Sequence, residues 1–206
     1  MEVDLMKKAP SNTRNKILSA AIAIFGSKGE VTTREITKMA GVNVASINYH
    51  FGSKNNLLKE VEEYYSELLY GMQDEILNNS LYSPREKLIY WANGLMEFMI
   101  KYPVLITLVS SLAYKDISYN PVLLKKFFFN PSLKEKLEEI ISQITNIEDE
   151  KVLNCKYTQI FSCILGPILF QTISNVYDGE RIFFDINKYE KRMEYILDFV
   201  DSILIN

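Results

Sequence analysis

Apolar residues recur every three or four positions along most of the chain, which is the spacing of one face of an α-helix. This pattern predicts helices over about 13–28, 32–40, 43–51, 54–79, 84–101, 104–114, 120–129, 132–145, 149–177 and 187–204. The segments 120–129 and 132–145 are interrupted only by Asn130 and Pro131, so the ten segments correspond to about nine helices. No stretch alternates apolar and polar residues strongly enough to predict a strand. The sequence therefore predicts an all-α protein of about nine helices.

The best-defined segment is the pair of short helices before Lys54. Thr32 and Glu35 have the spacing of a capping box, in which each side chain accepts a hydrogen bond from the other residue's backbone N–H. Gly41 supplies the left-handed conformation that ends the first helix, and Asn43 is suited to cap the second. The segment therefore predicts two helices joined by a tight turn.

The second helix of this pair has two different faces. Val44, Ile47 and Phe51 are expected to point inward. The opposite face contains small, polar and aromatic side chains and no carboxylate: Ala45, Ser46, Asn48, Tyr49 and His50. A helix of this kind fits the major groove of DNA, where small residues let the backbone approach the bases. An ordinary helical hairpin with a solvated face is the alternative from the pattern alone.

The N-terminal quarter resembles the DNA-binding domain of the tetracycline-repressor (TetR) family of transcriptional regulators. The matching residues are Thr13, Arg14, Ile17, Leu18, Ala21, Phe25, Gly29, Thr33, Ile36, Ala40, Gly41, Val42, Ile47, Tyr49, His50, Phe51, Ser53, Lys54, Leu57 and Leu58. The loop after Gly29 is about two residues shorter than is usual in the family, and Met39 stands where a small residue is common. Neither departure removes a residue expected to face DNA.

The resemblance implies a DNA-binding domain over 10–60, with the helix-turn-helix at about 33–52, and an effector-binding and dimerisation domain over 61–206. It also implies a homodimer that binds a palindromic operator and is released by a small effector. In the family the last two long helices form the dimer interface. We expect that interface to include Ile164, Ile168, Leu169, Tyr195 and Phe199.

Within the helix-turn-helix we expect different residues to read bases and to bind phosphates. Ser46 and Asn48 are assigned to base edges, while Val44 and Ala45 allow close approach or contact thymine methyl groups. Arg34 can serve either role. The residues assigned to phosphates are Thr33, Asn43, Tyr49, His50 and Lys54.

The distribution of charge agrees with a local contact to phosphate. The whole chain has a net charge of −3, which argues against general affinity for nucleic acid. Residues 1–60 contain 9 Lys and Arg against 5 Asp and Glu, a net +4, whereas residues 61–206 contain 14 against 21, a net −7. A basic N-terminal domain on an acidic C-terminal domain confines DNA contact to one end.

The C-terminal domain contains many bulky apolar side chains, and core packing is the plain interpretation of each. Since the family binds an effector within this domain, a cavity is expected there. We assign to it Trp91, Leu95, Phe98, Met99, Tyr102, Phe128 and Phe161. This aromatic lining with few charges favours a small hydrophobic or aromatic effector.

The sequence offers little for catalysis or metal binding. His50 is the single histidine, and Cys155 and Cys163 alone cannot close a zinc site. We therefore expect no enzyme activity, cofactor or metal, and reduced thiols rather than redox sensors.

The apolar segment 149–177 contains too many polar and helix-weakening residues to span a membrane, and no signal peptide precedes it, so we expect a cytoplasmic protein.

Several alternatives remain at this stage. A transcriptional activator of the same fold is one alternative, because no residue in the pattern distinguishes an activator from a repressor. A nonspecific DNA-binding protein would have no sequence preference. A helical enzyme would keep its turnover without residues 1–52, and a helical protein that binds other partners would have no affinity for DNA at low salt.

Overall fold

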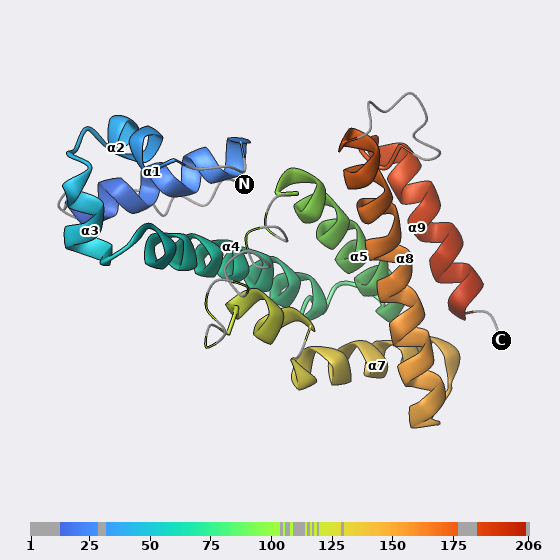
Figure 1. Ribbon diagram of the computed structural model, residues 1–206. Coiled ribbons are helices and arrows are strands. Elements are labelled where there is room, and N and C mark those ends of the chain that lie inside the picture. The colour runs from blue at the N-terminus through green and yellow to red at the C-terminus, as the bar shows by residue number, and fades with distance from the viewer. Residues whose placement is uncertain are drawn as a thin grey trace. The chain divides into compact units, whose positions relative to one another are not determined.

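A computed structural model describes residues 13–28, 32–103, 120–128, 130–176 and 185–204, together with residues 105, 108, 114, 116 and 118. In this described part, eight α-helices and one π-helix form and no strand is present, so the predicted all-α class is confirmed (Figure 1). The elements are α1 (Thr13–Lys28), α2 (Thr33–Ala40), α3 (Ala45–Phe51), α4 (Lys54–Leu77), α5 (Pro84–Lys101), η1 (Leu124–Phe128), α7 (Pro131–Thr145), α8 (Glu150–Val176) and α9 (Tyr189–Leu204).

The chain divides into two compact units. The head unit comprises Met1–Tyr65 and Val104–Pro121, and the body unit comprises Ser66–Pro103 and Val122–Asn206. The boundary falls inside α4, so one continuous helix begins in the head unit and ends in the body unit. The DNA-binding domain predicted over 10–60 belongs to the head unit.

The core of the head unit is formed where α1 packs against α2 and α3. Ile17, Ile36, Ile47 and Leu57 are completely or almost completely buried, one from each of its four helices. Burying an aliphatic side chain of this size stabilises the fold by about 1.5–3 kcal/mol. These four positions therefore fix the face that each helix turns inward and, with it, the face left outside.

The body unit is built around α5, which packs against α7, α8 and α9 (Figure 1). A second capping box starts α5: the Ser83 hydroxyl accepts from the Glu86 N–H at 3.3 Å, and the Glu86 carboxylate accepts from the Ser83 N–H at 2.8 Å. Arg192 ties α9 to α5, because its buried guanidinium donates to the Asn93 side chain at 2.9 Å and to the Ile186 carbonyl at 2.9 Å.

Several predicted helices differ from those observed. The segment 120–129 contains the π-helix η1 rather than a run of α-helix, and α3 begins at Ala45 instead of Asn43. The last helix, predicted over 187–204, begins at Tyr189, whose side chain is 54% exposed. Most of the predicted helix over 104–114 lies outside the described residues.

Candidate nucleic-acid interface

The turn between α2 and α3 is set by local hydrogen bonds. The capping box predicted at the start of α2 forms: the Thr32 hydroxyl accepts from the Glu35 N–H at 3.2 Å, and the Glu35 carboxylate accepts from the Thr32 N–H at 3.0 Å. At the other end Gly41 adopts φ 66°, and its N–H donates to the last carbonyls of α2. A side chain at that φ is strained, so glycine is required for the turn.

Asn43 starts α3 even though the regular helix begins two residues later. Its side-chain oxygen accepts from the Ala45 N–H at 3.0 Å, and its carbonyl accepts from the Ser46 N–H at 2.9 Å. The capping role predicted for Asn43 is therefore confirmed. The inward direction expected for Val44 is wrong, because that side chain is 47% exposed while Ile47 and Phe51 are buried.

The end of α3 is joined to the start of α4. Gly52 adopts φ 73° and ends α3. The Asn56 side chain donates to the Phe51 carbonyl at 3.0 Å, while the Asn56 N–H donates to the Ser53 hydroxyl at 3.1 Å. Asn56 thus satisfies the last carbonyl of one helix while its own N–H is capped by Ser53. No local pattern in the sequence predicts this role, because the pairing crosses a helix boundary.

Arg14 braces α3 from behind. Its guanidinium lies 4.8 Å from the centroid of the Phe51 ring and donates to both carboxylate oxygens of Glu60 at 2.7 Å. One side chain of α1 thereby connects the end of α3 to α4. The hydroxyl of Tyr65 adds a second link, because it donates to the Ile22 carbonyl of α1 at 2.9 Å.

The outward face of this unit holds the residues predicted to contact DNA. Arg34, Asn43, Val44, Ala45, Asn48 and Tyr49 are exposed, and Thr33, Ser46, His50 and Lys54 are half-buried. The Tyr49 ring is 85% exposed and meets the His50 ring edge-on at a centroid distance of 4.9 Å. All ten residues fall between Thr33 and Lys54, and none of them is buried.

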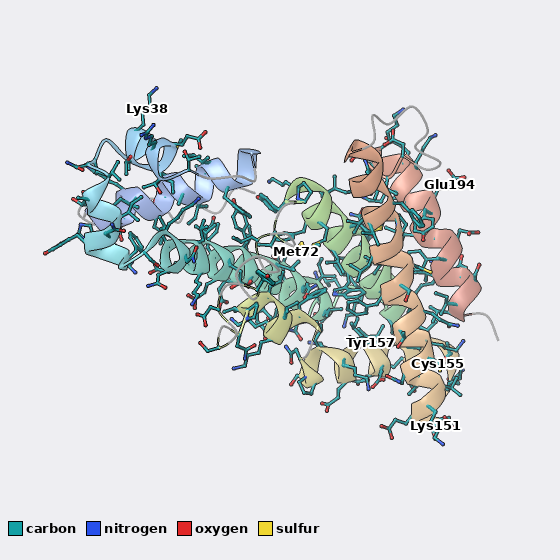
Figure 2. The ribbon with its side chains drawn as sticks, viewed as in Figure 1. Lys38, Met72, Lys151, Cys155, Tyr157 and Glu194 are labelled. Atoms are coloured by element: carbon teal, nitrogen blue, oxygen red, sulfur yellow. The ribbon has the colours of Figure 1, made fainter. Side chains whose placement is uncertain are left out.

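The electrostatics of this face favour an anion. No acidic residue occurs in α3, and the one acidic residue of α2, Glu35, is held in the capping box. Exposed Arg34 and Lys38 lie on α2, and Figure 2 shows Lys38 extending away from its helix. Lys38 is not among the residues predicted to contact DNA, although a cation one helical turn after Arg34 was a usable signal.

The residues predicted to line an effector cavity lie in the body unit. Trp91, Leu95, Phe98, Met99 and Phe161 are buried, Tyr102 is half-buried, and the side chain of Phe128 lies outside the described residues. Two small hollows occur in this unit, and neither has room for a water-sized sphere. Only Trp91 and Phe161 of the predicted set line the second hollow.

The five residues predicted for a dimer interface differ in exposure. Ile164, Ile168 and Phe199 are buried within the same chain, so they offer no surface to a partner. Ile164 and Ile168 lie on α8 (Glu150–Val176), which is apolar nearly all round, so their spacing could not separate a core face from an outer face. Leu169 is 60% exposed, and half-buried Tyr195 donates its hydroxyl to the Cys163 carbonyl at 2.8 Å. The pKa of Tyr195 is raised to about 12, first of all by burial.

The described residues contain neither a candidate membrane span nor a candidate metal-binding cluster. None of their helices is both long and apolar enough to cross a lipid bilayer. They also contain no cluster of three or more histidine, cysteine, aspartate or glutamate residues that could hold a metal ion.

Residues 17–61 match the family model for bacterial regulatory proteins of the tetR family. A probable HTH-type transcriptional regulator, YttP of Bacillus subtilis, is 29% identical over 143 residues, which are 68% of this chain and 66% of that protein. The HTH-type transcriptional repressor KstR2 of Mycolicibacterium smegmatis is 33% identical over 81 residues, 38% of this chain and 39% of that protein. The chain thus aligns with less than two thirds of the length of either relative.

Solved structures share the fold over nearly the whole length. The TetR-family transcriptional regulator PfmR of Thermus thermophilus superimposes with a TM-score of 0.58 at 20% identity, over 91% of this chain and 96% of that chain. At this identity the likeness establishes the helical fold alone.

Proposed function

Since the chain belongs to the TetR family of bacterial regulatory proteins, we propose that it is a sequence-specific repressor that binds a palindromic operator as a homodimer and is released by a small effector. The relative KstR2 is a transcriptional repressor, which favours repression over activation. The proposal places the chain in the cytoplasm, with the DNA that it binds.

The observation that carries this proposal is the outward face of α3. It is held in a fixed conformation by two glycines with positive φ, by Asn43 and by the Arg14 brace. Its exposed side chains are small or polar and include no carboxylate. A helix in the major groove has to meet both requirements, because it approaches base edges closely between two rows of phosphates.

The proposed division of roles follows from position and exposure. Asn48 is exposed in the middle of α3, and its amide has the paired donor and acceptor that an adenine edge requires, while half-buried Ser46 lies two residues earlier in the same helix. Val44 and Ala45 are exposed at the start of α3, where an apolar side chain can contact a thymine methyl group. Arg34 is exposed at the start of α2 and reaches either a base or a phosphate.

The phosphate contacts are proposed for the residues that flank these positions. They are Thr33, Asn43, Tyr49, His50 and Lys54. Lys54 begins α4, next to the end of α3, so its cation lies where the DNA backbone borders the groove. Such contacts set the register and the affinity without selecting a sequence.

A homodimer is supported by the outer face of α8. From Tyr157 to Val176 this helix contains no charged residue. Its exposed positions, Cys155, Gln159, Ser162, Leu169 and Phe170, follow the three- and four-residue spacing of one helix face. Leu169 and Phe170 are 60% and 72% exposed, and neighbouring Leu197 of α9 is 37% exposed. A two-fold partner would bury this face, as helix packing between protomers requires.

The effector is proposed to bind in the body unit and to favour a conformation in which the two DNA-binding domains no longer match the operator. A coupling free energy of about 1–3 kcal/mol, or about 5–150-fold in affinity, is the usual scale for such a response. α4 is the element through which this coupling would pass, because it belongs to both units.

The test is to incubate the purified protein with random DNA duplexes at about 0.15 M salt and to sequence the duplexes that stay bound. We expect a palindrome with half-sites about one helical turn apart. Binding without a motif that disappears as salt rises would contradict the proposal and indicate a nonspecific DNA-binding protein. A protein with Asn48→Ala and Ser46→Ala should retain DNA affinity at low salt and recover no motif, which assigns the specificity to α3.

A further inference from the structure

The first hollow of the body unit contains a buried polar group with no partner. The side chain of Gln73, on α4, is 2% exposed, and its amide nitrogen has no hydrogen-bond acceptor. The hollow is lined by Ser66, Leu69, Tyr70, Gln73, Leu123, Lys126 and Phe127, from α4 and the region of η1. An orphaned buried donor costs about 1–3 kcal/mol of stability, so its presence requires an explanation.

The second hollow contains another unpartnered donor. Trp91 is completely buried on α5, and its indole nitrogen has no acceptor. Aromatic rings form the wall between the two hollows: Phe127 of the first lies 5.6 Å from Phe161 of the second, and Trp91 lies 5.3 Å from Phe161, all between ring centroids. The donors of Gln73 and Trp91 therefore belong to different hollows, whose linings meet at the rings of Phe127 and Phe161.

Trapped water does not satisfy these donors. Neither hollow leaves space for the centre of a water-sized sphere, and a buried water needs about 10–15 Å³ of such space. The lining residues of both hollows include no aspartate or glutamate, whereas Lys126 adds a cation at the rim of the first. Two buried acceptors of the body unit, Oε1 of Glu138 and Oε1 of Gln171, also have no hydrogen-bond partner, but neither residue lines a hollow.

One wall of the first hollow belongs to a π-helix. Phe127 and Lys126 lie in η1, which is a π-helix of five residues. π-helical turns are rare and occur frequently at functional sites. Lys126 is paired with Glu67 and lies 5.3 Å from the Tyr70 ring centroid, so a displacement of η1 would change contacts with α4 directly.

We propose that the two hollows open into one binding chamber when Phe127 shifts, and that the effector is an apolar molecule bearing a carbonyl or carboxylate oxygen that accepts from Gln73. Trp91 supplies a second donor for an oxygen at the far end. In the conformation described, neither hollow holds even a water-sized sphere, so the effector needs the space that a shift of Phe127 opens. The inference rests on the proposed function for its regulatory consequence, but the binding itself does not require DNA.

The test compares three eight-carbon probes by calorimetry and thermal denaturation of the full chain. 2-Octanone and octanoate each carry an acceptor, and 1-octene carries none. We expect at least one of the first two to bind about tenfold more tightly than 1-octene, because the buried donor is satisfied only by an oxygen. A preference for octanoate over 2-octanone would identify a carboxylate ligand, and the reverse preference a neutral carbonyl.

Two variants assign the effect to Gln73. Gln73→Met removes the donor at nearly constant volume and should reduce the preference for the oxygen-bearing probe to about threefold or less. Its melting temperature should equal or exceed that of the wild type, because an unsatisfied polar group has been removed. Leu69→Met changes the lining of the same hollow without changing a donor and should keep the full preference.

Four results would overturn the inference. They are the absence of binding by any probe, equal binding of 1-octene and the oxygen-bearing probes, an unchanged preference in Gln73→Met, and a clear loss of stability in that variant, which would mean that Gln73 has a structural partner. These results are separable from the proposed function. Recovery of a palindrome without probe binding refutes the inference alone, whereas selective probe binding without a recovered palindrome refutes the DNA-binding proposal alone.

Discussion

The exposed faces of α3 and α8 differ in a way that separates two kinds of recognition. α3 presents Ser46, Asn48 and Tyr49, which are stable in water and need no permanent partner. α8 presents Leu169 and Phe170 within a segment that contains no charge, and such a face gains stability when it is covered. The proposed DNA contact and the proposed protein contact therefore differ in the polarity of the face that would make them.

The interiors of the two units differ as well. In the head unit the polar groups near the interface are satisfied locally, as Asn43, Ser53 and Asn56 illustrate. In the body unit two buried donors, on Gln73 and Trp91, have no partner. The named polar groups of the head unit thus have partners within the chain. The buried donors of Gln73 and Trp91 in the body unit need an additional molecule or a rearrangement to gain one.

The largest effect should come from placing a charge on the α8 face. Phe170→Asp buries a carboxylate in the proposed interface and should convert the protein to a monomer. Because one linked half-site raises the effective concentration at the other, operator affinity should fall by roughly 100-fold or more. Light scattering with size exclusion measures the mass, and fluorescence anisotropy with the selected operator measures the affinity.

Leu81→Asp is the matched control for this change. Leu81 is 87% exposed and lies outside the helices, so the same charge there should leave both the mass and the affinity unchanged. A Phe170→Asp protein that stays dimeric would place the interface on another surface of the chain.

On α3, one substitution should change specificity and a neighbouring one should not. Asn48→Ala should reduce discrimination at one base pair by about 1–3 kcal/mol. Lys54→Ala should weaken binding to every sequence alike and lower the salt slope of log K by about 1. Titrations of single-mismatch operators at several salt concentrations separate the two effects. Equal losses on every sequence from both variants would contradict the proposed division into base and phosphate contacts.

The two capping boxes offer a matched comparison of the units. Thr32→Ala and Ser83→Ala should each cost about 1 kcal/mol of unfolding free energy, because each leaves backbone donors at a helix start unsatisfied. Only Thr32→Ala should also weaken operator binding, since Thr32 positions α2 and the turn before α3. Urea denaturation and the operator titration give the two values. A loss of DNA affinity in Ser83→Ala equal to that in Thr32→Ala would show that α5 and α2 contribute alike to the interface.

The smallest effect concerns Asp116 of the head unit. Hydrogen bonds from Lys59, at 2.7 Å, and from Ser118 lower the pKa of Asp116 to about 2. A depressed folded-state pKa adds stability above the unfolded value near 3.8, and this stability is lost as pH falls through about 2. Asp116→Asn should therefore be less stable than the wild type at pH 6, with the gap shrinking between about pH 4 and pH 2. Urea denaturation at each pH measures it, and a gap independent of pH would contradict the assignment.

The sequence predicted the head unit well because its information is local. A capping box, a turn glycine and a capping asparagine lie within a dozen residues, and each specifies a backbone conformation without reference to the rest of the chain. The error at Val44 arose at a helix end, where the three- and four-residue spacing no longer determines direction. The bracing by Arg14 was out of reach, since nothing local pairs it with Glu60.

The body unit was predicted less completely because burial there depends on packing between distant segments. Helix α8 is apolar nearly all round, so its sequence could not separate the buried residues Ile164 and Ile168 from the exposed Leu169. The π-helical conformation of η1 has no sequence signature of its own. Nothing in the sequence distinguishes Gln73 from the other polar residues of α4, although three-dimensional packing buries it.

The position of the single tryptophan has a practical consequence for spectroscopy. Trp91 is completely buried beside Phe161 in the body unit, and the chain contains no other tryptophan. Fluorescence excited at the red edge of protein absorption therefore comes from Trp91 alone, which is far along the sequence from α3. Emission changes would report events around the hollows without any label. A tryptophan introduced at exposed Tyr49, in a chain with Trp91→Phe, would move the reporter to the DNA-facing surface.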